Sequence, residues 1–455
     1  MRQPTGSRTH TFKAQPILMN ASTREIEKHL HLLSVEIGTR VAGSPQEKEA
    51  ASAVENHFRR LGLKTGQLRF RFPDYLPKTC RLEITAGGKP GRVTSARPMA
   101  YTPNTPTGGV SGPLCFLQTG TEHDLAQPGL RGKVGLLLGS ANLRFSAFRR
   151  KLIDAKLKGL IVVDHRTEYR TPISAGAAPQ WMLDFSLPVV GVPHLVAVDL
   201  LKMGKLKVSL TTEGRRVSSE SQNVWAEIPG EGSAAQEIIV VTCHLDSVPD
   251  APGANDNGSG TAAVMELARI LRREKLKRTV RLIGFGVEER LSIGAYLYAT
   301  RQVQDANQIK LCINLDSIGA IAGEDIITTA GTPPLSRLVR KVYDACRHGA
   351  EFVEEISIYS DMFPLNMLGI PSAWCYRSGG MWAFHTKLDN FENVSPQATT
   401  RTTNTVAELV RRVAGAARLP FPRKIDPSMA SEIGAAAREN YSHPWNIEQA
   451  LRDLA

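Results

Sequence analysis

The second half of the chain alternates between apolar runs and segments with helical periodicity. Buried strands are predicted at 237–245, 279–287, 309–319 and 371–376, and helices between them at 259–274, 292–303 and 334–347. Near-continuous apolar strands separated by helices are typical of a parallel sheet that is covered on both faces. The pattern therefore predicts an α/β fold with a mixed, mostly parallel central sheet and helices on both of its faces.

The N-terminal part is predicted to add two helices and several short strands. Ser22 with Glu25 three residues later is the pattern of a helix start, and apolar residues then recur at helical spacing. A second helix is predicted at 45–63, and alternating polar and apolar residues beyond it indicate short strands. Residues 1–21 are expected to form a flexible tail.

Residues 100–215 have a different pattern from the segments on either side. Short β runs, one amphipathic helix at 145–159 and many Gly and Pro residues indicate a compact β-rich module. This module is predicted to interrupt a discontinuous domain that comprises residues 22–99 and 216–415. Residues 416–455 follow as a C-terminal extension, and their pattern indicates no role.

Composition and charge are those of an ordinary globular protein. A length of 455 residues, with 42% hydrophobic and 22% charged residues, fits two or three domains with apolar cores. The formal net charge is +12, but the basic residues are scattered and form no run of five or more. We therefore expect a basic surface and no nucleic-acid partner. The six cysteines lie far apart without a CxxC pair, which favours buried free thiols over disulfides.

The sequence shows no pattern for membrane insertion or export. No apolar stretch reaches the length of about eighteen residues that a membrane span needs. The first 20 residues contain basic side chains but no apolar segment behind them, which a signal peptide would require. We expect a cytoplasmic protein and leave export open, because Met19 offers an alternative start.

Residues of metal-ligand type gather where the predicted strands end. In open α/β sheets, ligands bind beyond the carboxyl ends of the strands. At those ends and in the loops beyond them, the sequence places His244, Asp246, Asp256, Glu288, Glu289, Asp316 and His385. Taken singly, such a histidine is commonly a structural hydrogen-bonding residue, and such an aspartate a helix cap. Together they supply the nitrogen and oxygen donors for two Zn²⁺ ions, with positions left open for water and substrate.

The same segments resemble the co-catalytic zinc peptidases of metallopeptidase family 28. The matching text is HLDS, GANDNGSGTAAVMELAR, GVEER, NLDSIG, SDMFPLNMLGIPSAW and FHTKLDNFENV, in the order of the family. The segment IGTRVAGSPQEKEAA resembles the N-terminal part of the family. In the inserted module, LRGKVGLLLG, AKLKGLIVV and LPVVGVP resemble a protease-associated domain. The resemblance covers residues 22–414.

The resemblance implies a role for each residue of the set. Five residues are implied as ligands of two Zn²⁺ ions per chain: Asp256 as the bridge, His244 and Asp316 in one site, and Glu289 and His385 in the other. Asp246 would hydrogen-bond the far nitrogen of His244 and fix its tautomer, and Glu288 would be the general base. Asp361 and Asp389 also match family positions, where they would orient neighbouring loops.

The sequence departs from the family at several positions. The family often has glycine after the paired glutamates, where this chain has Arg290. At the rim of the site, Arg290 would favour acidic or carboxylate-bearing substrates, unless it forms a surface salt bridge. Phe384 replaces a tyrosine that assists the oxyanion in many relatives, and Tyr376 is the candidate to replace that donor. Cys243 beside His244 faces the opposite side of its strand, which favours core packing over metal binding.

The resemblance implies a zinc-dependent exopeptidase. The leading interpretation is an aminopeptidase that removes N-terminal residues from peptides with a hydroxide that bridges the metals. A carboxypeptidase-like enzyme on the same two-zinc core stays open as the alternative, and a binding relative without metals is a further one. A glutaminyl-cyclase-like relative keeps a single zinc, which the five ligand candidates disfavour. A peptide substrate is the expected partner, homo-oligomers are possible, and the residue preference at the cleaved end is undetermined.

Overall fold

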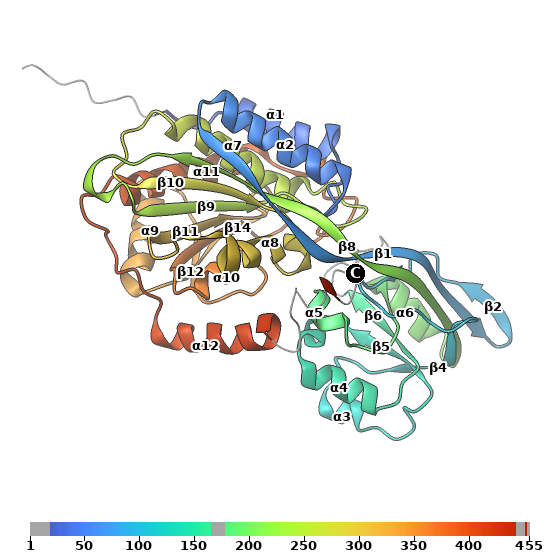
Figure 1. Cartoon of the computed structure of the whole chain (residues 1–455). Coiled ribbons are helices and arrows are strands. Elements are labelled where there is room, and N and C mark those ends of the chain that lie inside the picture. The colour runs from blue at the N-terminus through green and yellow to red at the C-terminus, as the bar shows by residue number, and fades with distance from the viewer. Residues whose placement is uncertain (1–18, 165–177, 443–450, 453–455) are drawn as a thin grey trace, which may run out of the picture.

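The computed structural model describes residues 19–164, 178–442 and 451–452, so most of the expected tail at 1–21 lies outside the described residues. The chain forms a mixed α/β fold around a large mixed sheet (Figure 1). Six strands lie in its second half: β9 (Ile238–His244), β10 (Thr279–Phe285), β11 (Ile309–Leu315), β12 (Asp325–Ala330), β13 (Glu351–Glu354) and β14 (Ser372–Arg377). Four of the pairings among them are parallel, and only β12 runs antiparallel to β14. The predicted mixed, mostly parallel sheet is confirmed.

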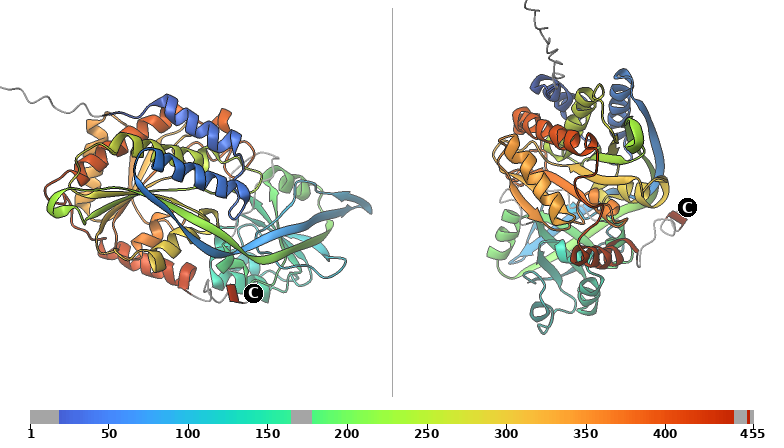
Figure 2. Two further views of the ribbon diagram at one scale, coloured as in Figure 1. Left: turned by 45° about the horizontal axis from the view of Figure 1, so that its top comes forward. Right: turned by 90° about the vertical axis from the view of Figure 1, so that its left-hand side faces the viewer.

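Helices cover both faces of this sheet (Figures 1 and 2). They are α1 (Thr23–His31), α2 (Pro45–Arg60), α7 (Gly260–Leu271), α8 (Ile293–Leu297), α9 (Pro333–Ala345), α10 (Met362–Asn366) and α11 (Pro396–Ala414). Ile239 and Val241 of β9 pack with α2, α7, α9 and α11, whereas Ile238 and Val240 pack on the side of α8 and α10. Because successive side chains of a strand point to opposite faces, a strand covered on both sides is apolar throughout.

Two long strands replace the short strands expected after residue 62. β1 (Lys64–Ala86) and β8 (Leu206–Ile228) pair antiparallel along almost their whole length, with an irregularity between Pro77 and Thr79. The expectation was wrong because proline and charged residues interrupt the alternation within β1, while pairing with β8 continues the strand across them. The ribbon starts in the central sheet, where β8 pairs with β10, and extends into the inserted module (Figure 1).

The inserted module continues the sheet from the far half of this ribbon. Its strands are β4 (Val110–Phe116), β5 (Val134–Leu138), β6 (Gly159–Asp164) and β7 (Val189–Pro193). Two short strands that precede residue 100, β2 (Lys89–Arg92) and β3 (Arg97–Pro98), pair with β1 and β7. Its helices are α3 (Glu122–Leu125), α4 (Ser146–Asp154), α5 (Pro179–Met182) and α6 (His194–Lys202). Leu82 of β1 and Val208 of β8 share one core with Leu136 and Ile161 of the module. The two long strands therefore run from the central sheet directly into the core of the module.

The six cysteines are all free thiols. Cys243, Cys312 and Cys375 are buried in the central sheet, Cys80 and Cys115 are half-buried, and Cys346 is exposed. Cys243 packs in the core with α7, on the face predicted for it from strand alternation.

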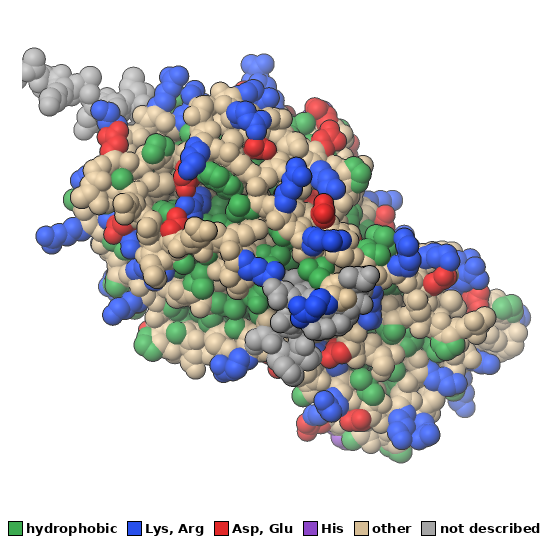
Figure 3. Space-filling model, in the orientation of Figure 1, with side chains coloured by type: hydrophobic (Ala, Val, Ile, Leu, Met, Phe, Trp, Pro, Cys, Tyr) green, Lys and Arg blue, Asp and Glu red, His purple; other side chains and the backbone are tan. Residues whose placement is uncertain are grey.

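On the face seen in Figure 3, basic side chains are dispersed and interleaved with acidic ones. None of the helices in the described ranges is long and apolar enough to cross a membrane. Neither observation tests the predicted location of the protein or its predicted lack of a nucleic-acid partner.

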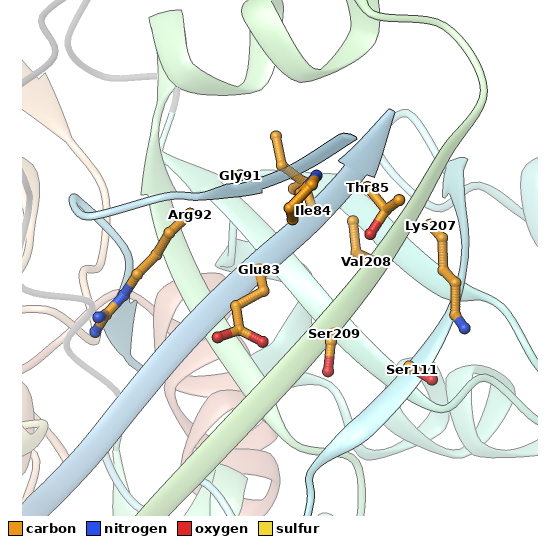
Figure 4. A pocket seen from close by; sticks show the side chains of 10 residues that line it. Glu83, Ile84, Thr85, Gly91, Arg92, Ser111, Lys207, Val208 and Ser209 are labelled. Carbon is orange, nitrogen blue, oxygen red and sulfur yellow. The ribbon is translucent and has the colours of Figure 1, made fainter. Parts of the chain in front are cut away.

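A groove of about 560 Å³ lies on the module end of the β1–β8 ribbon (Figure 4). Glu83, Arg92 and Lys207 contribute charged side chains to its lining, together with Ser111 and Ser209. None of the predicted metal ligands lines this groove. The predicted chemistry is therefore located elsewhere, at the carboxyl ends of the central strands.

Candidate metal centre

Five of the predicted site residues converge into two adjoining groups at the strand ends. His244, Asp256 and Asp316 form one group, and Asp256, Glu289 and His385 the other; in each group, one donor atom per residue lies within 4.8 Å of the others. His244 Nε2 is 3.1 Å from Asp256 Oδ1 and 3.4 Å from Asp316 Oδ1. His385 Nε2 is 3.0 Å from Glu289 Oε2 and 3.5 Å from Asp256 Oδ2. The grouping is the one that the sequence resemblance implied.

Asp256 belongs to both groups and presents a different carboxylate oxygen to each. Oδ1 faces His244, whereas Oδ2 faces His385. The backbone around Asp256 is held by Asp389, whose carboxylate accepts hydrogen bonds from the amides of Asn255 at 2.7 Å and Asp256 at 3.0 Å. Burial and the charge of Asp256 raise the pKa of Asp389 to about 7. Asp389 thus lies where it orients the loop that carries the shared carboxylate.

The imidazole of His244 is oriented by Asp246. His244 Nδ1 lies 3.1 Å from the backbone oxygen of Asp246 and 3.6 Å from its carboxylate. A carbonyl oxygen only accepts hydrogen bonds, so Nδ1 carries the proton and the lone pair of Nε2 points toward Asp256 and Asp316. Asp246 thus contacts the far nitrogen of His244 through its backbone oxygen, with its carboxylate close behind, as the resemblance implied.

The carboxylate of Asp246 also holds the turn that carries the paired glutamates. Its two oxygens accept hydrogen bonds from the amides of Glu288 at 3.0 Å and Glu289 at 3.2 Å. Glu288 Oε1 accepts a hydrogen bond from the Ser292 hydroxyl at 3.1 Å. Burial raises the pKa of Glu288 well above its ordinary value, and the charges of Asp361 and Glu289 add to this effect against the attraction of His244. A carboxylate with a raised pKa is suited to general-base work near neutral pH.

The donor set fits zinc. Each group offers one imidazole nitrogen and two carboxylates, a set typical of catalytic zinc sites that keep an open position. Burial raises the pKa of Asp316 and of Glu289, and repulsion from Asp256 adds to the rise, so the bare site resists holding its full negative charge. Glu289 Oε1 is buried and has no hydrogen-bond partner among the described residues. Divalent cations would offset the negative charge of the carboxylates and would bind the unpaired oxygen of Glu289.

Arg40 is a residue of the site region to which the sequence analysis assigned no role. It lies in the IGTRVAGSP segment, is fully buried, and its guanidinium donates to five backbone carbonyls, those of Leu33, Gly38, Leu245, Pro252 and Gly253. Burial lowers the pKa of Arg40, but the carboxylates of Asp389, Asp246, Asp256 and Glu289 oppose this effect. Arg40 therefore ties the loop after β9 to the N-terminal helices and brings a positive charge toward the carboxylates.

Arg290 does not lie at an exposed rim. Its side chain is buried, and its guanidinium is 5.8 Å from the ring centroid of Tyr101 of the inserted module. This covered position corrects the expectation of an exposed rim, and Arg290 forms no salt bridge with the described residues. A preference for acidic substrates stays a prediction. Leu291, which follows Arg290, packs in the same apolar core as residues of the inserted module.

Tyr376 lies near the end of β14, where the backbone on either side of it bonds to Asp316 and Ser317. Its ring stacks on Trp374 with centroids 4.4 Å apart, and Glu355 and Glu351 are the charged groups around its phenol. The replacement of the oxyanion donor by Tyr376 stays a prediction. Phe384 stacks on the ring of His385, with centroids 3.7 Å apart, and so braces a predicted ligand.

Asp361 is completely buried, and neither of its carboxylate oxygens has a hydrogen-bond partner within the described ranges. Burial raises its pKa well above the ordinary value, with His244 opposing and Asp316 and Asp246 adding to the rise. The Ser292 hydroxyl of the glutamate turn also acts on the Asp361 carboxyl, in the direction of a lower pKa, and the loop-orienting role stays a prediction.

Glu47 is a second buried acid behind the glutamate turn. It lies on α2, where Oε1 accepts a hydrogen bond from the Ser221 hydroxyl at 2.6 Å and Oε2 accepts one from the Gly43 amide at 2.7 Å. Burial, with the charge of Asp246, raises its pKa from 4.5 to about 8.

We expect Glu47→Gln to stabilise the metal-free chain at pH 9 and to have little effect at pH 5. The folded chain binds the Glu47 proton more tightly than the unfolded chain, so wild-type stability falls as pH rises through about 8. A glutamine has no proton to lose, and its amide oxygen can still accept one of the two hydrogen bonds that Glu47 accepts. The gain at pH 9 should be on the order of 2–4 kcal/mol. Thermal unfolding of both chains at the two pH values measures it, and a pH-independent difference would refute the assignment.

Residues 223–410 match the model of peptidase family M28. This matched segment is named the M28 domain after that model. All five residues of the two metal-ligand groups, together with Asp246 and Glu288, lie inside the M28 domain, whereas Arg40 and Glu47 precede it.

Curated relatives extend the similarity beyond the M28 domain. Aminopeptidase YwaD of Bacillus subtilis (strain 168) is 27% identical over 416 residues, which cover 85% of each chain. The probable lipoprotein aminopeptidase LpqL of Mycobacterium tuberculosis is 29% identical over 315 residues, which cover 66% of this chain and 59% of LpqL. The similarity therefore includes segments on the N-terminal side of the M28 domain.

Solved structures share the whole architecture. The aminopeptidase from Aneurinibacillus sp. strain AM-1 has a TM-score of 0.70 at 25% identity, over 90% of this chain and 97% of its own. BSAP, a zinc aminopeptidase from Bacillus subtilis, has a TM-score of 0.71 at 23% identity, over 90% and 98% of the two chains. The M28 domain and the inserted module thus occur together in known folds.

Proposed function

We propose that this chain is a zinc-dependent aminopeptidase. The observation that carries the proposal is the carboxylate of Asp256, which is shared between two groups of zinc-ligand type within an M28 domain. Relatives similar over most of the chain are named aminopeptidases, which supports hydrolysis at the N-terminal end of peptides.

We infer that the chain holds two zinc ions. His244, Asp256 and Asp316 would hold one ion, and Asp256, Glu289 and His385 the other. Three protein donors per ion leave room for water and substrate. Zinc bound there supplies Lewis acidity, which makes water a nucleophile near neutral pH and polarises a carbonyl group.

Glu288 is the proton carrier of the proposed reaction. Its carboxylate takes a proton from the attacking water and gives it to the nitrogen of the leaving amine. The hydrogen bonds that the backbone amides of Glu288 and Glu289 donate to the Asp246 carboxylate fix the turn. The Ser292 hydroxyl fixes one oxygen of Glu288. The other oxygen of Glu288 is then the one that exchanges the proton.

The zinc-loaded site would also favour a free N-terminus. A peptide α-amine has a pKa of about 7.7–8.0, so part of it is neutral near pH 7, and its lone pair would bind at a zinc position left open by the protein ligands. Acetylation removes this lone pair. An N-terminal amine requirement separates an aminopeptidase from a carboxypeptidase, which acts at the other end of the substrate.

The proposed function is tested with one leucine-led peptide, offered with a free and with an acetylated N-terminus. The chain is stripped of metal with a chelator and then reloaded with zinc. We expect release of the first residue from the free peptide only, and only after zinc is returned. Release from the C-terminal end of both peptides would replace the proposal with a carboxypeptidase. Failure to cleave either peptide at full zinc occupancy would contradict peptidase activity toward leucine-led substrates.

We also infer that the inserted module is a protease-associated domain. Its parallel strands β5, β6 and β7, flanked by α4 and α6, agree with the sequence resemblance of that region. Its buried contact from Tyr101 to Arg290 reaches the turn that carries Glu288. This contact supports a position of the module beside the active site of the proposed enzyme.

A further inference from the structure

The C-terminal extension returns to the active-site region. After α11 the chain continues to α12 (Pro427–Ala437), which lies below the central sheet on the side of the inserted module (Figures 1 and 2). The amide of Asp426 donates to the carbonyl of Gly331, which attaches the start of α12 to the M28 domain. The segment therefore spans the junction between the two parts of the chain.

Residues just beyond α12 bind the inserted module. Asn440 accepts a hydrogen bond from the indole nitrogen of Trp181 at 3.1 Å, and Glu439 accepts one from the amide of Ser146 at 2.7 Å. Ile433 packs in the same apolar core as Trp181. The contacts of Trp181 with Asn440 and Ile433 are buried, so this part of the extension is fixed against the module.

Tyr441 extends from this anchored segment into the M28 domain. Its ring is stacked between Tyr296, at 5.3 Å, and Phe363, at 5.5 Å, and only 2% of its surface is exposed. Its hydroxyl donates to the carbonyl of Leu291 at 3.3 Å. Leu451, also in the extension, packs in the neighbouring cluster with Val287.

The carbonyl that Tyr441 binds belongs to the turn that carries Glu288. The amides of Leu291 and Ser292 both donate to the carbonyl of Glu288. Leu291 has φ +65° and Ser292 has φ +48°, a left-handed conformation that non-glycine residues adopt at a cost. Contacts from outside the turn are needed to hold it, because its local preference opposes the observed backbone.

We propose that Tyr441 is a positioning residue for Glu288, so that the C-terminal extension completes the active site. Its hydroxyl fixes the carbonyl of Leu291 in the strained turn, and its stacked ring fixes the hydroxyl. Arg290 of the same turn contacts Tyr101 of the inserted module. Asn440, next to Tyr441, binds Trp181 of the module. The kinetic part of this inference rests on the proposed function, whereas the structural part does not.

The test is Tyr441→Phe in the full chain, with Tyr343→Phe as the matched control. Tyr343 lies on α9, is also fully buried, and packs in the core that includes α7 and α11. Its hydroxyl donates a hydrogen bond to Cys375 Sγ at 3.5 Å. Both changes remove one hydroxyl and keep the ring. Amide hydrogen exchange of residues 287–294, kcat and KM on the leucine-led peptide, and the unfolding temperature are measured for both variants.

We expect Tyr441→Phe to speed exchange at 287–294 and to lower kcat about 3- to 10-fold, the loss expected for one hydrogen bond, with KM and unfolding temperature near wild type. The control should leave the exchange of 287–294 and kcat unchanged. Unchanged exchange and kcat in Tyr441→Phe would overturn the proposal, as would an equal loss in Tyr343→Phe. If wild-type chain cleaves no peptide, the proposed function fails, and the exchange comparison still decides whether Tyr441 holds the turn.

Discussion

Replacing Glu288 with glutamine is expected to lower kcat by about 10²- to 10⁴-fold, the usual contribution of a general base. Glutamine keeps the shape of the side chain and still accepts a hydrogen bond from Ser292, but it cannot take a proton. Zinc content should remain that of the wild type, because Glu288 belongs to neither metal-ligand group. The measurement is kcat on the leucine-led peptide, with zinc analysis of the same sample.

The control for this change is Glu354→Gln, at an exposed glutamate of β13. It alters the net charge by the same amount and lies on β13, at one end of the strand order of the sheet. We expect wild-type kcat from the control. A kcat for Glu288→Gln within about threefold of the control would show that another group carries the proton.

The second large effect is expected for Asp256→Ala, which should weaken binding of both zinc ions. Each metal-ligand group has three donors and Asp256 belongs to both, so its loss leaves two donors in each group. Catalytic zinc sites commonly use three protein ligands. Activity should fall below detection, and zinc titration should show at least about 100-fold weaker binding for both ions, by comparison with the 10- to 100-fold typical of outer-shell changes.

Asp316→Ala and Glu289→Ala are the matched comparisons. Each removes one carboxylate from one group only. We expect each variant to keep one tightly bound zinc ion, whereas Asp256→Ala keeps none. One retained ion in all three variants would mean that the Asp256 carboxylate is not shared in the way that its two oxygens indicate.

The arrangement of the metal-ligand groups was predictable because strand polarity determines it. β9, β10 and β11 are parallel and consecutive in the sheet, so residues after their carboxyl ends meet at one edge. The apolar runs identified these strands, and the charged residues followed directly at their ends. His385 is different, because it lies in a loop after β14, and only the family resemblance indicated it.

The errors have a common cause in tertiary contacts. β1 was expected to be several short strands, since proline and charged residues break its alternation, but pairing with β8 keeps it continuous. Arg290 was expected at an exposed rim, since charged residues are seldom buried, but the ring of Tyr101 covers it. In both cases the deciding partner lies far away in the sequence.

For the same reason, the sequence pattern indicated no role for the C-terminal extension. Tyr441 follows a short helix with little amphipathic contrast, and no local pattern distinguishes it from any other tyrosine. Its importance comes from stacking between Tyr296 and Phe363, which lie on different elements of the M28 domain. Likewise, Arg40 gains its role from carbonyl groups that only the folded loop after β9 brings together.

Anomalous diffraction at the zinc edge from crystals of the zinc-reloaded chain tests the central claim most directly. We expect two anomalous peaks at the carboxyl ends of β9, β10 and β11. One peak should lie beside His244 and Asp316 and the other beside Glu289 and His385, with the carboxylate of Asp256 between them. A single peak, or peaks that avoid either group at saturating zinc, would contradict a two-zinc centre that shares Asp256.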